Sequence, residues 1–465
     1  MPPSDLGDEL HASLAQADRW LEQRSQQRAA TLADVYGRVV RVSGMLISAR
    51  MPCVSVGELC RVLSHAQVCA RQHNAVESLG LLAEVVGFSG NETLLAPLGP
   101  VDGISSSSLV EALGYSHSID VGDHLLGRVL DAFGRPLDRP GLEAIGPVLR
   151  CPVITEAVGP AERPRICEPL VTGVRAIDGL LTLGQGQRVG LFAGPGCGKT
   201  TLLAALARGV EADAVVFGLI GERGRELREL LEHELDPAIV ARSVFICATS
   251  DRPAMERARA AFTATTIAEG WSRSGRNVLL LIDSLTRFAR AQREIGLAAG
   301  EPPGRLGFPP SVYAMLPRLI ERAGKTEQGS ISAMYTVLVE GETTSDPIAD
   351  EARSLLDGHI LLSRKLAERG HYPAIDVLTS LSRVMSNIVA SPQKRAASRF
   401  RELLGKYQDL ELLISLGEYQ PGSDALSDEA VRLYPELLKF LQQDTSSSAS
   451  WSDTQDNLYD LGNAW

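Results

Sequence analysis

The chain has 465 residues, of which 44% are hydrophobic and 22% charged, and its formal net charge is -11 at pH 7. This length exceeds what one ordinary hydrophobic core holds, so two or three domains are expected. The acidic balance argues against non-specific binding to nucleic acid. The seven cysteines form no C-x-x-C pair, so neither a zinc site nor a disulfide framework is indicated, and reduced thiols in the cytosol are the simpler interpretation.

The first segment, residues 1–32, predicts an amphipathic helix. Its apolar residues recur at spacings of three and four: Leu6, Leu10, Leu14, Ala17 and Leu21. The segment is acidic and lacks an apolar centre, so it is not read as a signal peptide, and no run of the chain approaches the roughly 20 apolar residues that span a bilayer. Packing on the protein itself or on a partner is favoured over a membrane-surface role, because the polar face is not basic.

The next two segments differ in their secondary structure. Residues 33–105 contain short β-rich runs broken by glycine, such as YGRVVRVSGMLISA, which predict a small barrel or sandwich. Residues 106–385 alternate apolar strands of β type, such as AVVFGLIG and NVLLLIDS, with helical patterns. That alternation predicts an α/β domain with a parallel sheet wrapped by helices.

The last part of the chain is helical and then polar. Residues 386–443 are typical of helices, and their leucines are expected in the core rather than on a docking surface: Leu410, Leu412, Leu413 and Leu416. Residues 444–465 are rich in serine and aspartate, so a disordered tail is expected, in which Trp451 and Trp465 are candidates for a docking motif.

A glycine-rich segment, GPGCGKTT, joins a predicted strand to a predicted helix. Its three glycines let the backbone approach a phosphate, and the helix N-terminus adds partial positive charge. In the pattern G-x-x-x-x-G-K-[ST], whose first glycine is replaced here by Ala193, Lys199 reaches the β- and γ-phosphates and the Thr200 hydroxyl binds magnesium. The residues predicted to bind ATP in this segment are Gly194, Pro195, Gly196, Cys197, Gly198, Lys199, Thr200 and Thr201.

Two carboxylates follow predicted strands. Asp283 ends NVLLLID, at the carboxyl end of the sheet where ligands gather, and a magnesium ligand is favoured over a helix cap because a phosphate loop precedes it in the chain. Glu222 directly follows the strand VVFGLIG, so its carboxylate can stand near the γ-phosphate as a base for water. A surface charge pair with Arg223 or Arg225 explains Glu222 equally well at this point.

Several motifs carry a resemblance to a known family. GPGCGKTT, GERGRE, LLLIDSLTRFARAQRE and PAIDVLTSLSRVM together resemble the catalytic subunits of the rotary ATPase superfamily, which includes the F-type and V-type enzymes. YGRVVRVSG, GDHLLGRVLDAFGRPLD and LVEGETTSDPIADEARSLLDGHI are similar to the type III secretion ATPases, over roughly residues 33–442. The resemblance implies an N-terminal small β-barrel, a central RecA-like P-loop ATPase domain with a mostly parallel sheet, a C-terminal helical domain, and hydrolysis of ATP with Mg²⁺.

The resemblance also implies roles for individual residues. Glu222 in GERGRE is similar to the glutamate that polarises the attacking water, and Arg223 beside it is counted with the catalytic residues. By the same resemblance, Asp283 is expected to hold magnesium through water, and Arg287 in DSLTR to lie beside the carboxylates of Glu222 and Asp283.

Two further residues concern the base and the neighbouring subunit. Tyr372 in HYPAID matches the aromatic on which adenine stacks, and Arg383 in LSRV matches an arginine finger that reaches into the next subunit's site. Because one chain carries phosphate loop, glutamate and finger, a homohexamer with little activity as a monomer is expected.

The resemblance extends to partners and location. The implied partners are a stator protein at the inner membrane, bound through the N-terminal segment, a central stalk protein, the export gate, secretion chaperones and exported proteins, with no nucleic acid. The implied location is cytoplasmic, peripherally associated with the cytoplasmic face of the inner membrane.

Four alternatives stay open. A flagellar export ATPase is a near relative, although REIGLAAGEPPGRLGFPPSVYAMLPRLIERAG is more similar to the injectisome version. A rotary synthase subunit would continue after LGE with an acidic segment that is absent here. A non-catalytic ring subunit would not need both Lys199 and Glu222. A ring-shaped RNA motor would need an aromatic RNA-binding barrel, whereas residues 34–105 hold only Tyr36 and Phe88 as aromatics.

Overall fold

The computed structural model describes residues 36–463, apart from 44, 65–66, 68–79, 140–145, 340–345, 423 and 445. The amphipathic helix predicted for residues 1–32 and the docking candidate Trp465 lie outside the described residues. The chain divides into two compact units, Met1–His117 and Ser118–Trp465.

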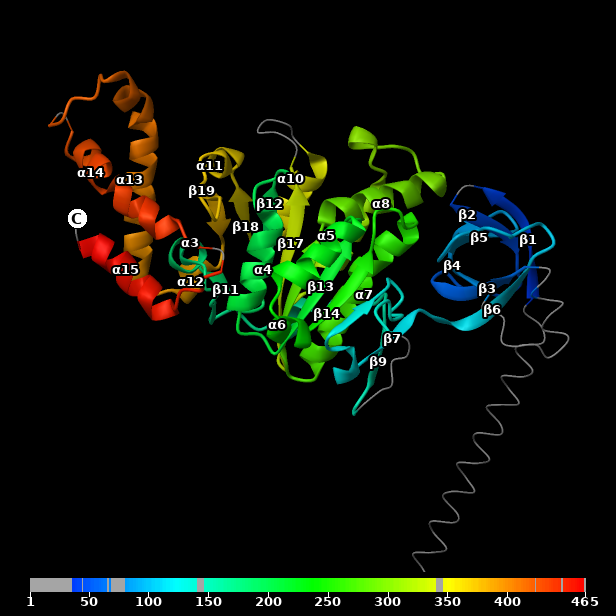
Figure 1. Cartoon of the computed structure of the whole chain (residues 1–465). Helices are drawn as coiled ribbons and strands as arrows, with labels where there is room; N and C mark the ends of the chain where they lie inside the picture. Colours follow the sequence, from blue (N-terminus) through cyan, green and yellow to red (C-terminus); the bar gives the residue numbers. More distant parts are fainter. Residues whose placement is uncertain are drawn as a thin grey trace, which may run out of the picture. The chain divides into compact units, whose positions relative to one another are not determined.

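The first unit is a closed barrel, drawn in blue and cyan in Figure 1. Its strands run in the order β1-β2-β5-β4-β3-β6, and every neighbouring pair is antiparallel. Alternate side chains fill the interior, among them Ile47, Val62 and Leu95, which are fully buried. The strands are β1 (Tyr36–Ser43), β2 (Leu46–Arg50), β3 (Glu58–Leu63), β4 (Leu81–Ser89), β5 (Glu92–Pro97) and β6 (Leu109–Ser116).

The barrel was predicted, but its predicted end at residue 105 is wrong. β6 pairs with both β1 and β3, so it is the strand that closes the barrel. The serines before it form a turn, in which the Ser108 amide donates to the Ser105 carbonyl at 3.0 Å. The boundary therefore falls after this turn and one strand later, near His117.

The second unit is built on a nine-stranded sheet in the order β19-β18-β12-β17-β15-β13-β14-β8, with β16 paired to β17. All pairs are parallel except β18·β19 and β16·β17, which confirms the mostly parallel sheet. The strands are β8 (Arg128–Leu130), β12 (Arg188–Ala193), β13 (Ala214–Ile220), β14 (Ser243–Ala248), β15 (Asn277–Asp283), β16 (Gly324–Lys325), β17 (Ser330–Leu338), β18 (Gly358–Leu362) and β19 (Ile375–Ser382).

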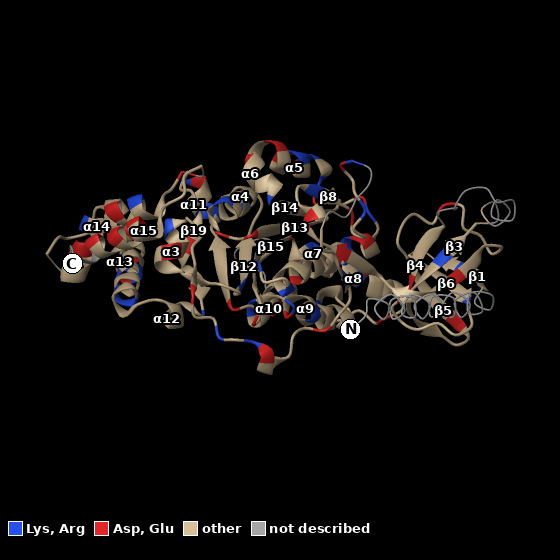
Figure 2. Ribbon diagram, turned by 90° about the horizontal axis from the view of Figure 1, so that it is seen from below, with Lys and Arg blue, Asp and Glu red and all other residues tan. Residues whose placement is uncertain are grey.

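The strands β13 and β14 are buried along their whole length, as expected for a parallel sheet whose two faces are covered by helices. In Figure 2 the central strands are largely tan, and the charged residues lie mostly on helices and connections. The long helix α7 packs on β13, β14, β15 and β17.

The helices and minor elements complete the second unit. The helices are α3 (Arg175–Leu180), α4 (Lys199–Gly209), α5 (Gly224–Glu229), α6 (Pro237–Ala241), α7 (Ala254–Arg273), α8 (Leu285–Ala298), α9 (Pro310–Ile320), α10 (Pro347–Leu355), α11 (Arg364–Glu368), α12 (Met385–Ile388), α13 (Ser391–Leu416), α14 (Ala425–Leu441) and α15 (Trp451–Asn463). The minor elements are β7 (Ser118–Val121), β9 (Leu149–Pro152), β10 (Pro169–Leu170), β11 (Leu183–Gly184), the 3-10 turns η1 (Asp123–Leu125), η2 (Pro160–Glu162) and η4 (Arg305–Gly307), and the π-helical turn η3 (Leu230–Glu234). None of the described helices is both long and apolar enough to span a bilayer.

The predicted disordered tail at residues 444–465 is wrong, because α15 is a packed helix. Ser450 caps it by accepting a hydrogen bond from the Asp453 amide at 3.0 Å, and Thr454 and Leu458 are fully buried. α15 packs on α13, α14 and α3 (Figure 1, red). Its apolar face therefore belongs to the same core as the nine-stranded sheet.

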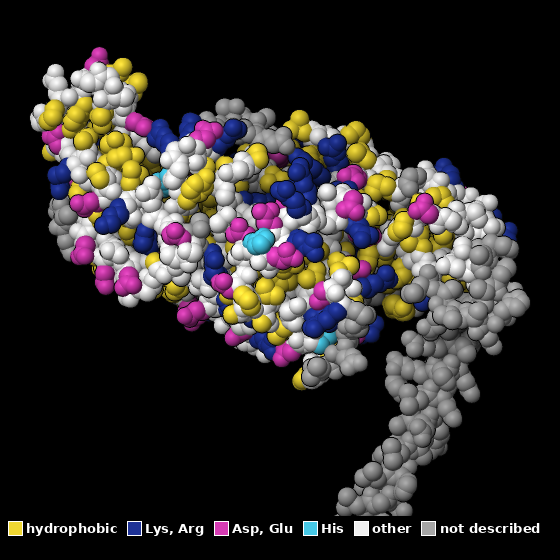
Figure 3. Space-filling view, in the orientation of Figure 1, with side chains coloured by type: hydrophobic (Ala, Val, Ile, Leu, Met, Phe, Trp, Pro, Cys, Tyr) yellow, Lys and Arg dark blue, Asp and Glu magenta, His cyan; other side chains and the backbone are white. Residues whose placement is uncertain are grey.

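The leucines near the end of α13 are not in the core. Leu412, Leu413 and Leu416 are 67%, 40% and 62% exposed, respectively, so the prediction that they are buried is wrong. Figure 3 shows hydrophobic side chains at the surface of these C-terminal helices, while basic and acidic side chains are interspersed over most of the face drawn.

Candidate active site

The candidate site lies at one edge of the central sheet. The adjacent parallel strands β12, β17, β15 and β13 end there. β12 leads into the glycine-rich segment, β17 carries Thr336, β15 ends in Asp283, and Glu222 follows β13 after one glycine. Because the carboxyl ends of parallel strands share one edge, residues far apart in the sequence meet here.

The glycine-rich segment forms a tight turn before α4. Gly196 and Gly198 have φ values of 78° and 83°, in the left-handed region that favours glycine. Pro195 is exposed at the tip, whereas Cys197 is buried in the hydrophobic core. α4 starts at Lys199, so Lys199, Thr200 and Thr201 form its first turn, where backbone amides are free to bind an anion. Gly194 is half-buried at the end of β12.

Four charged side chains form one cluster at the strand ends. Lys199 Nζ lies 2.6 Å from Asp283 Oδ1 and 3.3 Å from Glu222 Oε1. Arg287 Nη2 lies 3.2 Å from Glu222 Oε2, and its Nη1 donates to the Gly221 carbonyl. The structure thus brings Lys199, Glu222, Asp283 and Arg287 together as predicted, and Glu222 pairs with neither Arg223 nor Arg225 among the described contacts.

The cluster shifts the proton affinities of its members. Burial favours the neutral form of Lys199, but the carboxylates of Asp283 and Glu222 outweigh it and raise the Lys199 pKa. Burial and the neighbouring carboxyl of Glu226 raise the pKa of Glu222, against the opposing effect of Lys199 and Arg287. Lys199 is therefore a fixed cation, and Glu222 has a proton affinity above that of an ordinary glutamate, which suits a proton acceptor.

The oxygen atoms of the site fit Mg²⁺. Asp283 Oδ1 accepts from Lys199 and, at 2.6 Å, from the Thr336 hydroxyl; within the described residues Asp283 Oδ2 accepts no hydrogen bond and is left for a metal-bound water. Thr200 adds a hydroxyl, and such hard oxygen donors are those that Mg²⁺ prefers. No group of three or more His, Cys, Asp or Glu in the described part of the chain can hold a metal alone, so phosphate oxygens would supply the remaining ligands.

A cavity of about 300 Å³ opens beside the glycine-rich turn. Tyr372, 40% exposed, lies at this cavity, and its ring atoms Cδ1 and Cε1 are 3.7 and 3.6 Å from where a Cβ on Gly198 would stand. The ring is therefore close to the phosphate loop, as expected for a base-stacking residue. The cavity is lined by Val174, Gly196, Cys197, Gly198, Thr201, Leu202, Ala205, Leu362, Tyr372, Pro373, Ala374, Gln443, Asp444 and Ser447.

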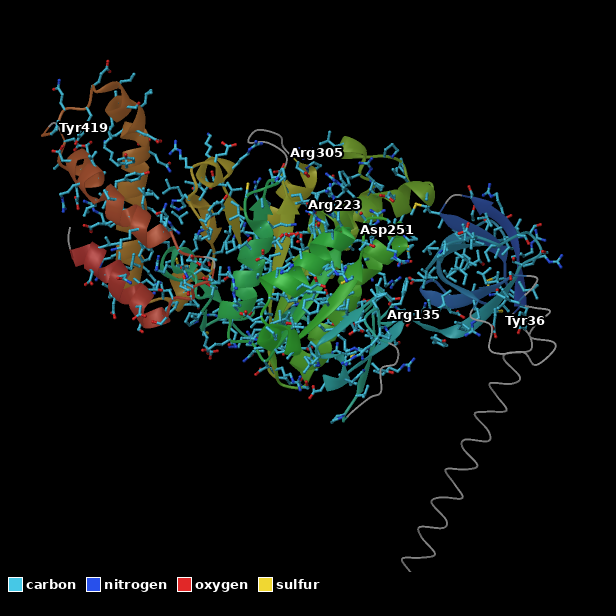
Figure 4. All side chains as sticks on the ribbon, viewed as in Figure 1. Tyr36, Arg135, Arg223, Asp251, Arg305 and Tyr419 are labelled. Carbon is cyan, nitrogen blue, oxygen red and sulfur yellow. The ribbon has the colours of Figure 1, made fainter. Side chains whose placement is uncertain are left out.

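Two predicted arginines stand apart from the cluster. Arg223, labelled in Figure 4, is 79% exposed at the start of α5 and lies 3.9 Å from Glu226; the structure therefore does not support counting it with the catalytic group. Arg383 follows β19 and is exposed, and its Nη2 donates to the Arg353 carbonyl at 3.2 Å.

The sequence interpretation missed two contributions to the site. Thr336, near the end of β17, orients Asp283 through its hydroxyl; a polar residue near the end of an apolar strand was the available signal. Gln443, Asp444 and Ser447 line the cavity, but the segment that holds them was predicted to end a helix and begin a disordered tail.

Models of known protein families match three parts of the chain. The ATP synthase alpha/beta family nucleotide-binding domain matches residues 173–382, and the beta-barrel domain of that family matches residues 39–114. The fold and the strand-end cluster thus define an ATPase of the ATP synthase alpha/beta class. The T3SS EscN ATPase C-terminal domain matches residues 389–460. The chain belongs to the type 3 secretion system ATPases within that class.

The relatives support this assignment over nearly the whole chain. The type 3 secretion system ATPase of Pseudomonas syringae pv. syringae is 56% identical over 92% of this chain and 94% of its own length. The flagellum-specific ATP synthase of Bacillus subtilis is 49% identical over 89% of this chain and 92% of its own. The solved structure of the assembled ATPase EscN from enteropathogenic E. coli superposes with a TM-score of 0.84 at 44% identity, covering 91% of this chain and 99% of that one.

Proposed function

We propose that this ATPase works as a homohexameric ring that energises type III protein export. The observation that carries the proposal is where the charged groups lie: three of them meet within one chain, and the predicted arginine finger stands apart from them. Lys199 contacts both Glu222 and Asp283 within one chain, whereas the side chain of Arg383 is exposed and, in the described residues, donates only to the Arg353 carbonyl. An arginine so placed is available to a second copy of the chain, and such a finger contributes about 10³ to 10⁵ in rate in related enzymes.

Each residue of the cluster has a separate task in hydrolysis. The glycine-rich turn and Lys199 bind the phosphates, and Tyr372 holds the base. Glu222 orients the attacking water and accepts its proton, while Arg287 keeps the Glu222 carboxylate in place. Thr200 and, through water, Asp283 would hold a magnesium ion, which would supply positive charge to balance the charge that develops on the phosphates.

The partners and location belong to the same proposal. EscN has been solved in complex with its central stalk EscO, and the exposed Leu412, Leu413 and Leu416 on α13 offer an apolar surface for a stalk, a chaperone or an exported protein. We place the ring in the cytoplasm, against the inner membrane below the export gate, held by a stator protein through residues 1–32, where it releases chaperones and unfolds substrates.

Mixing two inactive variants tests the shared site. Glu222→Gln lacks the base and Arg383→Ala lacks the finger, so each alone should be inactive. In mixed rings, some interfaces regain both groups and hydrolysis should return in part. Native mass spectrometry of the same samples establishes that mixed rings formed. Mixed rings as inactive as their parents would contradict a site shared between subunits.

Capture of the assembly tests the export role. The complex is isolated with magnesium and a non-hydrolysable nucleotide and weighed by native mass spectrometry. Six identical copies with a stator protein or secretion chaperones would support the proposal, and the partner's identity would separate an injectisome from a flagellar system. A ring alternating with a second, homologous subunit would refute it.

A further inference from the structure

The base-side cavity has a wall that comes from the far end of the chain. Gln443, Asp444 and Ser447, between α14 and α15, line the same cavity as Tyr372 and the glycine-rich turn. We infer that Gln443 is a positioning residue for the nucleotide base, which acts by holding Tyr372 and thereby couples base binding to the seating of the C-terminal helices. The inference rests on the ATP site proposed above.

The hydrogen bonds of Gln443 support this role. Its backbone amide donates to the carbonyl of Tyr372 at 3.0 Å. Its side-chain Oε1 accepts from the Arg175 amide at 2.9 Å, and Nε2 donates to the carbonyls of Gly173 at 2.7 Å and Ser447 at 3.0 Å. Both donors of the side-chain amide are used and its oxygen is engaged, so the position of this residue is tightly determined.

The turn at Gly173, to which the Gln443 side chain donates, is also fixed by hydrogen bonds from other residues. The buried carboxylate of Asp178 accepts from the Gly173 amide at 2.9 Å, and the Gly173 carbonyl also accepts from the Ala449 amide at 2.9 Å. The Arg175 guanidinium donates to the Phe440 carbonyl at 3.0 Å, near the end of α14. The segment after α14 is therefore anchored to the turn before α3.

The position of Tyr372 determines how Gln443 affects binding of the base. Tyr372 lies between the phosphate loop, through Gly198, and the C-terminal segment, through Gln443. Loss of the Gln443 side chain removes the bonds that fix this residue to Gly173, Arg175 and Ser447. The Ala449 amide and the Arg175 guanidinium still hold the segment, but the Gln443 amide that donates to the Tyr372 carbonyl is then less firmly placed. Phosphate binding at Lys199 uses none of these bonds, so only the base part of the affinity should change.

Steady-state kinetics on the full chain test the inference. Gln443→Ala should raise the KM for ATP about fivefold, the value of roughly one lost hydrogen bond, with little change in kcat. Tripolyphosphate, which lacks a base, serves as a competitive probe, and its inhibition constant should stay unchanged. Gln442→Ala is the matched control, because the Gln442 side chain is exposed and only its backbone carbonyl accepts from Arg175.

A double-mutant cycle distinguishes positioning from a general structural role. With Tyr372→Ala in place, Gln443→Ala should add little further loss, because the ring that it positions is gone. Additive losses, equal losses for ATP and tripolyphosphate, or no change in KM would each overturn the inference. Should Gln443→Ala not fold, Gln443→Asn carries the same comparison. A parent chain that binds neither ATP nor tripolyphosphate would instead refute the proposed ATP site, and the inference with it.

Discussion

Replacing Glu222 by glutamine separates its chemical role from its structural one. The amide has the same shape but cannot take a proton, so turnover should fall about 10² to 10⁴-fold, as when a general base is lost. The cluster should survive, because Lys199 keeps its contact with Asp283 at 2.6 Å. We therefore expect the circular dichroism spectrum of the variant to match that of the parent.

The same change should not weaken nucleotide binding. At 3.3 Å between Lys199 Nζ and Glu222 Oε1, the attraction between the two charges is about 5 kcal/mol at an effective dielectric constant of about 20. That attraction competes with the phosphates for one ammonium group, so Glu222→Gln should bind ATP at least as tightly as the parent.

Two assays together decide this prediction. Phosphate release at saturating ATP measures turnover, and an equilibrium titration with a non-hydrolysable nucleotide measures affinity. Glu229→Gln, on the exposed side of α5, controls for removal of an acidic charge nearby. Turnover within about threefold of the parent, or a loss of affinity parallel to the loss of turnover, would show that Glu222 is not the base.

The remaining predictions concern pH and stability. A hydrogen bond with the Glu226 side chain raises the Glu222 pKa, and activity needs the Glu222 carboxylate, so Glu226→Gln should move the acidic limb of the pH–activity profile to lower pH; an unmoved limb would contradict this coupling between the two side chains. Arg322→Ala should destabilise by about 3 to 5 kcal/mol in urea unfolding, because the buried Glu269, which it now pairs with at 2.7 Å, would keep only the longer contact with Arg273 at 3.8 Å; a loss below about 1 kcal/mol would contradict this. Deleting residues 450–465 should cost about 3 to 6 kcal/mol from the leucines of α15 alone, and an unchanged thermal midpoint would show that α15 adds nothing.

The parts of the site that lie on strand ends were predictable. A glycine-rich turn between an apolar strand and a helix is typical of a phosphate-binding loop. Asp283 and Glu222 each stand at the end of an apolar run. What the sequence left undecided was the partner of Glu222. The order of the strands determines this partner, because β15 lies next to β13. The helix α8, which follows β15, places Arg287 on the side of the Glu222 carboxylate opposite Lys199.

The errors have a common physical origin. Composition was given more weight than position: the β-rich pattern was taken to end at residue 105, just where a run of serines begins, and the serines at 446–450 suggested disorder. In both places, short hydroxyl side chains make local hydrogen bonds that begin the next element, as Ser450 does for α15. Arg223 was counted with the site because it adjoins Glu222, but successive residues that leave a strand point to opposite sides.

The attachment of the C-terminal segment to the turn before α3 also bears on how the protein is made. Synthesis runs from the N-terminus, and domains generally begin to fold as they emerge. The phosphate loop emerges well before residues 439–449, which supply the bonds to Gly173, Arg175 and Tyr372. A nascent chain therefore completes its base-side wall only after residue 449 has been made. Chains released early would carry a phosphate loop without a finished nucleotide pocket, so premature products would compete poorly for ATP.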